Sequence, residues 1–158
     1  IMVLGIRFCY RFWLMRRTRG DKEAALAELK KRSLQVPGGT CGFWGTCGAA
    51  VSAGQAMSVL NGSTPMTQEP WAQCQRLTSM ILGRLADLGG PRCCKRTGYT
   101  SVLTAVPYID MTLGANMQLP DRVTCTFFSR NAECRRQQCP YFPNADPEIA
   151  ARYQPVSA

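Results

Sequence analysis

In the first part of the chain, apolar and polar residues alternate at the spacing of a helix. Glycine, proline and asparagine residues that end helices separate these stretches. Residues 21–32 (DKEAALAELKKR) are strong helix formers with acids early and bases late, and Val36-Pro37-Gly38-Gly39 follows them. Residues 48–60 (GAAVSAGQAMSVL) combine small and apolar side chains, which lets a neighbouring backbone approach closely, and Asn61-Gly62 ends this stretch. The pattern predicts a helix over each range.

A longer amphipathic stretch lies between residues 67 and 88. One face carries seven apolar or small side chains: Trp71, Cys74, Leu77, Thr78, Ile81, Leu85 and Leu88. Thr67 is the expected N-cap, Pro70 falls in the first turn, and Gly89-Gly90-Pro91 follows the last turn. These features predict a third helix.

The second half of the chain predicts less regular structure. A fourth helix is expected to begin within residues 92–99 and to run toward Leu113, with Pro107 disturbing it. Residues 123–128 (VTCTFF) are β-branched and aromatic, which predicts one short strand. Residues 143–158 contain three prolines and are expected to form an extended tail.

The fold class that follows is mainly α: a small domain of about four helices, one short strand and Cys-rich loops, over residues 21–142. A chain of 158 residues and 17.5 kDa suits one domain. The chain contains no histidine, which excludes His-ligated haem, His-ligated zinc or copper, a Ser-His-Asp triad and a Cys-His dyad.

Residues 1–20 form an apolar and basic segment outside the expected core. Of the 19 Lys and Arg residues, nine lie within residues 1–33. Arg7 and Arg11 interrupt an apolar run that is too short to span a membrane. We expect this segment to dock on a protein partner or a second copy of the chain, with an interfacial helix on an anionic membrane surface as the less favoured alternative. The pI is about 9.4, but no nucleic-acid-binding motif accompanies the charge, so no nucleic acid is expected.

Cysteine is the residue type that suggests chemistry. Seven of the nine cysteines form three groups beside glycine or proline: Cys41 and Cys47, the adjacent Cys93 and Cys94, and Cys125, Cys134 and Cys139. Glycine neighbours allow backbone amides to turn toward a bound anionic centre. Cys74 lies on the apolar helix face and is expected to be a buried structural residue, and Cys9 carries no signal.

Three chemistries compete for the seven thiols. An iron–sulfur cluster, expected to be of the [4Fe–4S] type, takes four thiolates from loops of this kind. Structural zinc also accepts thiolates, but its Cys-x2-Cys pairs do not occur here. Disulfides or free thiols are the third alternative, although neither a cleavable signal nor a regular disulfide spacing is visible. Seven thiols can supply one four-cysteine site with spares, or two sites with an outside ligand.

The adjacent Cys93 and Cys94 form a separate candidate site. Side chains of neighbouring residues diverge, so the two thiols are not expected to bind one metal together. At a helix start beside basic residues, one or both would gain thiolate character and act as catalytic nucleophile or redox centre. The basic residues that would bind an anion or substrate there are Arg92, Lys95 and Arg96.

A set of unusual motifs resembles a known family. The motifs are residues 36–50 (VPGGTCGFWGTCGAA), Thr64-Pro65, residues 89–96 (GGPRCCKR) and the Asn131 to Pro140 segment that contains Cys134 and Cys139. Over residues 21–142 the chain resembles an uncharacterised cysteine-rich domain family of anaerobic archaea and bacteria, some members of which are joined to methyltransferase-like domains. The resemblance implies an anaerobic, thiol-rich, metal-binding module and no particular reaction.

Three hypotheses follow. The first is a cytoplasmic iron–sulfur protein with a redox or cluster-assisted role in anaerobic metabolism. The second is an enzyme that uses a reactive thiolate at Cys93 or Cys94. The third is a noncatalytic, partner-docking subunit whose cysteines bind zinc or stay free. The sequence leaves open whether the protein is an enzyme.

Overall fold

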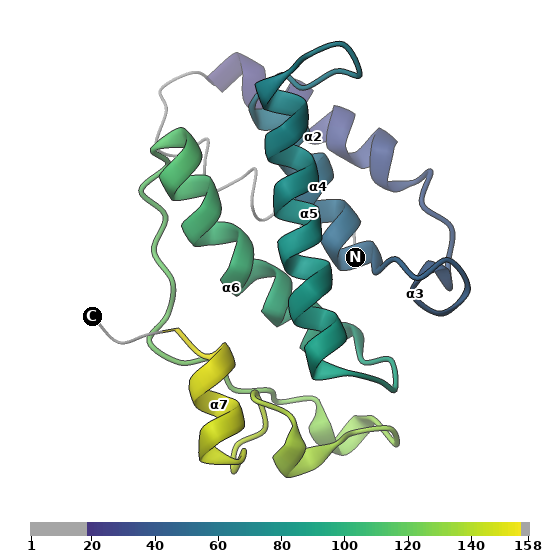
Figure 1. Ribbon diagram of the computed structural model, residues 1–158, viewed down its shortest axis with the longest axis vertical. Coiled ribbons are helices and arrows are strands. Elements are labelled where there is room, and N and C mark those ends of the chain that lie inside the picture. The colour runs from purple at the N-terminus through teal and green to yellow at the C-terminus, as the bar shows by residue number, and fades with distance from the viewer. Residues whose placement is uncertain (1–18, 156–158) are drawn as a thin grey trace.

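The computed structural model describes residues 19–155, and these are mainly helical (Figure 1). The α-helices are α2 (Arg19–Ser33), α3 (Thr40–Phe43), α4 (Gly48–Leu60), α5 (Glu69–Leu88), α6 (Cys94–Leu113) and α7 (Pro147–Tyr153). Two single-turn 3₁₀ helices, η1 (Phe128–Arg130) and η2 (Arg136–Gln138), lie between α6 and α7. The four predicted helices correspond to α2, α4, α5 and α6.

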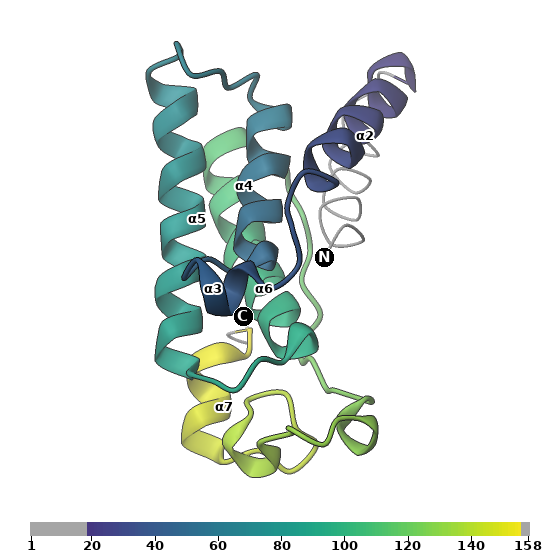
Figure 2. The same cartoon turned by 90° about the vertical axis from the view of Figure 1, so that its right-hand side faces the viewer.

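Helices α4, α5 and α6 form an up-down-up bundle (Figure 2). Consecutive helices run in opposite directions, so α4 and α6 point the same way. The N-termini of α4 and α6 therefore lie at the same end of the bundle as the C-terminus of α5, and α3 lies across this end. Helix α2 leans away from the bundle on the other side of α4.

The close approach expected for residues 48–60 is confirmed at the contact between α4 and α5. Four alanines of α4 are at most 4% exposed: Ala49, Ala50, Ala53 and Ala56. A Cβ added at Gly54 would lie 2.2 Å from Thr78 Oγ1 of α5. Only a residue without a side chain lets the two helices pack at this point.

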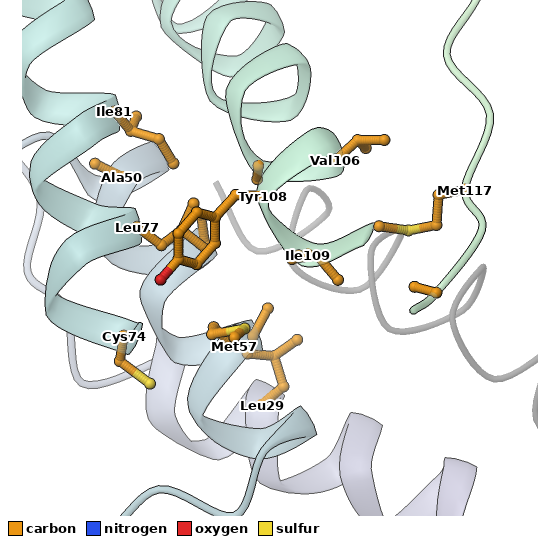
Figure 3. Close-up of a cluster of buried hydrophobic side chains, with 14 residues drawn as sticks. Leu29, Ala50, Met57, Cys74, Leu77, Ile81, Val106, Tyr108, Ile109 and Met117 are labelled. Carbon is orange, nitrogen blue, oxygen red and sulfur yellow. The ribbon is translucent and has the colours of Figure 1, made fainter. Parts of the chain in front are cut away.

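Large apolar side chains from four helices fill the centre (Figure 3). Leu29 of α2, Met57 of α4, Leu77 and Ile81 of α5 and Ile109 of α6 are each at most 1% exposed. Burial of this apolar surface is the main stabilising contribution to such a bundle. Cys74 is buried beside this core, with Sγ 3.8 Å from Asn61 Oδ1, which confirms its structural role.

The strand expected over residues 123–128 is wrong, because no residue in the described part of the chain is in a strand. The backbone of Val123 pairs instead with the Gln154 side chain, which accepts from its N–H at 2.9 Å and donates to its carbonyl at 2.8 Å. A further bond joins Cys125 N to the Tyr141 carbonyl at 2.7 Å. Because no second strand lies beside this β-prone segment, a side chain and a loop pair with its backbone N–H and carbonyl groups instead.

Two expectations about helix ends are also wrong. Thr67 does not cap α5; its hydroxyl donates to the Thr64 carbonyl at 2.8 Å, and the N-cap is Gln68. The extended tail expected over residues 143–158 contains helix α7. Asp146 caps α7 by accepting hydrogen bonds from the N–H groups of its second and third residues. Pro147 occupies the first turn, where proline is tolerated because its missing N–H needs no partner.

Residues 114–146, here called the irregular segment, first run back along the side of the bundle from the end of α6 and then cover the end of the bundle next to the start of α6 (Figure 1). A small second core of Leu103, Cys139 and Tyr141 holds this segment against α6. Burial raises the pKa of Tyr141 to about 12. No helix among residues 19–155 is long and apolar enough to cross a membrane. The docking role expected for residues 1–20 concerns a segment that, up to residue 18, lies outside the described range.

Candidate functional site

The seven candidate cysteines divide between two neighbouring spaces at one end of the bundle. Four line a small space, here called the four-cysteine cavity: Cys93, Cys125, Cys134 and Cys139. Three line an open space, here called the three-cysteine groove: Cys41, Cys47 and Cys94. The described cysteines are all free of disulfides. The adjacent Cys93 and Cys94 therefore diverge, as predicted, and each belongs to a different set.

The four-cysteine cavity lies between the start of α6 and the irregular segment. Cys93 is the N-cap of α6, and Cys139 follows η2. The remaining lining is largely aromatic: Tyr99, Phe127, Phe128, Tyr141 and Phe142, with Lys95, Arg96 and Asn131. The cavity volume is about 30 Å³, roughly the share of one molecule in liquid water.

N–H groups point at three of the four cavity sulfurs. The pairs are Asn131 Nδ2 with Cys93 Sγ (3.6 Å), Phe127 N with Cys125 Sγ (3.4 Å) and Arg136 N with Cys134 Sγ (3.5 Å). The fourth thiol, Cys139, is buried, and this burial raises its pKa despite the opposing backbone hydrogen bond from Tyr141 and the charge of Arg96. Metal binding at Cys139 would release the thiol proton, since a metal ligand is the thiolate.

The cysteines are not placed to share a single ion. Within residues 19–155, no group of three or more Cys, Asp or Glu side chains could hold one metal ion as the side chains stand. This applies to the cavity and to the groove.

The three-cysteine groove is formed where four helices meet. Cys41 lies in α3, Cys47 is the N-cap of α4, and Cys94 is the first residue of α6. The C-terminal part of α5 and the Gly89-Gly90-Pro91 turn complete the lining. Cys41 and Cys94 are exposed, and the volume of the groove is about 780 Å³. This size is typical of a ligand pocket.

Arg96 lies between the two spaces and lines both. The side chain is 3% exposed, and its Nη2 donates to the carbonyls of Gly89 at 2.8 Å and Pro91 at 2.6 Å. Its Nε has no hydrogen-bond partner among the described residues. No Asp or Glu among the described side chains lines the cavity or the groove, and none of them forms an ion pair with Arg96.

The three basic residues that were predicted to bind an anion do not act as one group. Arg92 is exposed and lines the groove, whereas Lys95 lies over the Phe127 ring at 3.8 Å from its centre and lines the cavity. Only Arg96 reaches both spaces. The helix start separates them because successive side chains leave it in different directions.

Two lining features were not singled out from the sequence. Asn131 holds a turn, accepting from Glu133 N at 3.2 Å, and also donates to Cys93 Sγ. The sequence does not reveal the contact with Cys93, because an Asn in a turn is already explained by its local hydrogen bonds. Gly83, in the middle of α5, lines the groove, and its unfavourable position within a helix was the available signal.

A family model for a family of unknown function, DUF5714, matches residues 14–142. The chain belongs to the DUF5714 family. The DUF5714 match includes all seven cysteines of the cavity and the groove, and the family description assigns no activity. No curated protein and no solved structure matches the chain.

Proposed function

We propose that the protein binds an iron–sulfur cluster through Cys93, Cys125, Cys134 and Cys139, and that this centre serves redox or cluster-assisted chemistry. The observation that carries the proposal is the convergence of four thiols on one cavity from two distant parts of the chain. Four cysteines are the usual ligand set of a [4Fe–4S] cluster. Within the part of the chain that the structure describes, no other metal-binding side chain lines the cavity.

The contacts of the sulfurs support a metal-bound state. Hydrogen bonds to ligand sulfurs are among the features by which a protein tunes an iron–sulfur cluster. Phe127 N and Arg136 N each belong to the residue two positions after the cysteine that they contact. Lys95 and Arg96 add positive charge beside a centre that four thiolates would make negative.

The lack of a single-ion site within residues 19–155 favours a cluster over zinc. Zinc draws four sulfurs to about 2.3 Å from one atom, whereas each thiolate of a four-iron cluster binds a separate iron and stays further from the others. The absence of a single-ion group in residues 19–155 agrees with the wider arrangement. The cavity is small, so the segment that carries Cys125, Cys134 and Cys139 must move outward to admit a cluster. Its regular structure amounts to two three-residue 3₁₀ turns, so few backbone hydrogen bonds resist this movement, while the buried contacts of Cys139 and Tyr141 oppose it.

Metal and acid-labile sulfide analysis of protein purified without oxygen tests the proposal. Iron and sulfide in equal amounts, with broad visible absorption, are expected. Substitution of Cys93, Cys125, Cys134 or Cys139 by Ser should remove one cluster. Cys74→Ser is the matched control, because a serine hydroxyl can keep the contact with Asn61. Zinc without iron, or the same cluster content in all four variants, would overturn the proposal.

In this proposal the protein works in the cytoplasm of an anaerobic cell. Thiolate-bound clusters persist where thiols stay reduced, and the described cysteines form no disulfide.

A further inference from the structure

We infer that the three-cysteine groove is a second cluster site, in which Cys41, Cys47 and Cys94 hold an iron–sulfur cluster with one iron open to a small ligand. The groove and the four-cysteine cavity share no cysteine. The inference therefore stands or falls independently of the centre proposed above.

The number of ligands leaves one coordination position open. Apart from the three cysteines, no Cys, Asp or Glu of residues 19–155 lines the groove, and the chain contains no histidine. A [4Fe–4S] cluster needs four ligands when it is fully held by protein. Three thiolates leave the fourth iron facing the groove, where an exogenous molecule can bind, as at other open metal sites.

Arg96 is the independent observation that points to an anionic occupant. A buried charge without a counter-ion is unfavourable. The guanidinium of this 3% exposed side chain donates to the carbonyls of Gly89 and Pro91, but its Nε is unpaired among the described residues. A cluster on three thiolates is negative and would lie against Arg96. The exposed Arg92 lines the same groove from the other side of Cys94 in the sequence.

The N-termini of α4 and α6 also favour a negatively charged occupant of the groove. Helices α4 and α6 have 13 and 20 residues, and both begin at the groove. Unpaired N–H groups at helix N-termini stabilise negative charge. Their N-caps, Cys47 and Cys93, make no side-chain capping hydrogen bond.

Glycines line the groove where the protein itself does not require them. A Cβ added at Gly38, Gly42, Gly83 or Gly90 would meet nothing within 4 Å, and none of the four has a positive φ. Gly83 lies inside α5, where glycine costs roughly 0.5–1 kcal/mol relative to alanine. All four are exposed, so neither packing nor backbone conformation requires glycine there, and an occupant of the groove has room beside them.

Cluster stoichiometry of the full chain tests the inference. After reconstitution with iron and sulfide, two filled sites give about eight irons per chain. Cys41→Ser, Cys47→Ser and Cys94→Ser should each lower the iron content by about half, and so should Cys134→Ser, which empties the cavity. If iron is lost only in the cavity variants, the groove inference is wrong and the proposed function stands; the reverse result contradicts the proposed function alone.

Cyanide is a suitable probe of the open iron. In Cys134→Ser protein, which retains only the groove cluster, cyanide should change the electron paramagnetic resonance spectrum of the reduced cluster. An unchanged spectrum would contradict the open position. The variant Cys9→Ser should keep the groove cluster and its cyanide response; loss of either would show that Cys9 is the fourth ligand and would overturn the inference.

Gly83→Ala provides a variant that does not touch a ligand. The new methyl group should stabilise α5 and raise the thermal midpoint, yet lower cyanide affinity or cluster occupancy at least threefold. Ser79→Ala, on the exposed surface of the same helix and outside the groove, should change neither occupancy nor cyanide binding. Equal behaviour of the two variants at the groove would count against an occupant beside Gly83.

Discussion

The phenol of Tyr141 donates a hydrogen bond to the hydroxyl of Thr100 at 2.8 Å, and both side chains are fully buried. The direction follows from the Thr100 hydroxyl, whose own proton goes to the Arg96 carbonyl at 3.0 Å. This bond ties Tyr141, which lies two residues after Cys139, to the seventh residue of α6. Tyr141 also lines the four-cysteine cavity, so the bond holds one part of the cavity wall in place.

Tyr141→Phe should therefore destabilise the protein by about 1 kcal/mol, because it leaves the Thr100 oxygen without a donor in a buried position. Urea unfolding of the metal-free chain measures the change. Tyr153→Phe is the matched control, since the Tyr153 hydroxyl makes only a long bond of 3.5 Å to the Arg84 carbonyl. An equal loss in both variants would mean that the buried bond has no special role.

Gly54→Ala should destabilise the protein by roughly 1–2 kcal/mol, although alanine favours helices, because the new methyl group would collide with Thr78 Oγ1. In a Thr78→Ala background the same change should become neutral or stabilising. Thermal unfolding of the four proteins of this double-mutant cycle gives the coupling energy. Additive effects would show that α4 can shift away from α5 without cost.

Thiol accessibility should rank the cysteines of the metal-free protein. Cys41 and Cys94 are exposed and should react first with iodoacetamide at neutral pH, whereas Cys74 and Cys139 are buried and should react last. The raised pKa of Cys139 acts in the same direction, because fewer of its thiols are ionised at that pH. Mass spectrometry of timed samples gives the order, and early labelling of Cys139 would contradict the placement of the cavity.

Arg96 should affect both proposed sites, whereas its neighbours should affect one each. We expect Arg96→Met to accelerate iron release to a chelator about tenfold from both sites, which corresponds to about 1.4 kcal/mol. Lys95→Met should act on the cavity and Arg92→Met on the groove, following the residues that line each. The single-site variants Cys134→Ser and Cys94→Ser separate the two release rates. A selective effect of Arg96→Met on one site would contradict its shared position.

Removal of metal should loosen one region in particular. Residues 114–146 have few backbone hydrogen bonds, and metal ties to Cys125, Cys134 and Cys139 would restrain them. Hydrogen exchange should therefore accelerate in this segment after chelation, while α4 and α5 keep their protection. Uniform acceleration throughout the chain would indicate that the metal supports the whole fold instead.

The helices were predictable because their signals are local. Residues 48–60 match α4 at both ends, since glycine and asparagine mark its limits and small residues fill it. Asp146-Pro147 carried an equally local signal for α7, but the surrounding prolines favoured an extended tail in its place. The strand over residues 123–128 failed for a nonlocal reason, because β propensity acts only where another strand is available.

The candidate site was predictable in composition and not in arrangement. Sequence identified the seven cysteines and the basic residues beside Cys93 and Cys94. Their division into four and three depends on which way the start of α6 faces, and this is set by the packing of α6 against α5 and the irregular segment. The spacing of the cysteines along the chain does not show which way the start of α6 faces.

The division of the cysteines also sets an order of appearance during synthesis. Every groove thiol lies at or before Cys94, whereas three of the four cavity thiols lie at or after Cys125. As the chain emerges from the ribosome, the groove ligands are complete while Cys93 still lacks all of its partners. At this stage of synthesis the groove set of thiols is complete, whereas the cavity set consists of Cys93 alone.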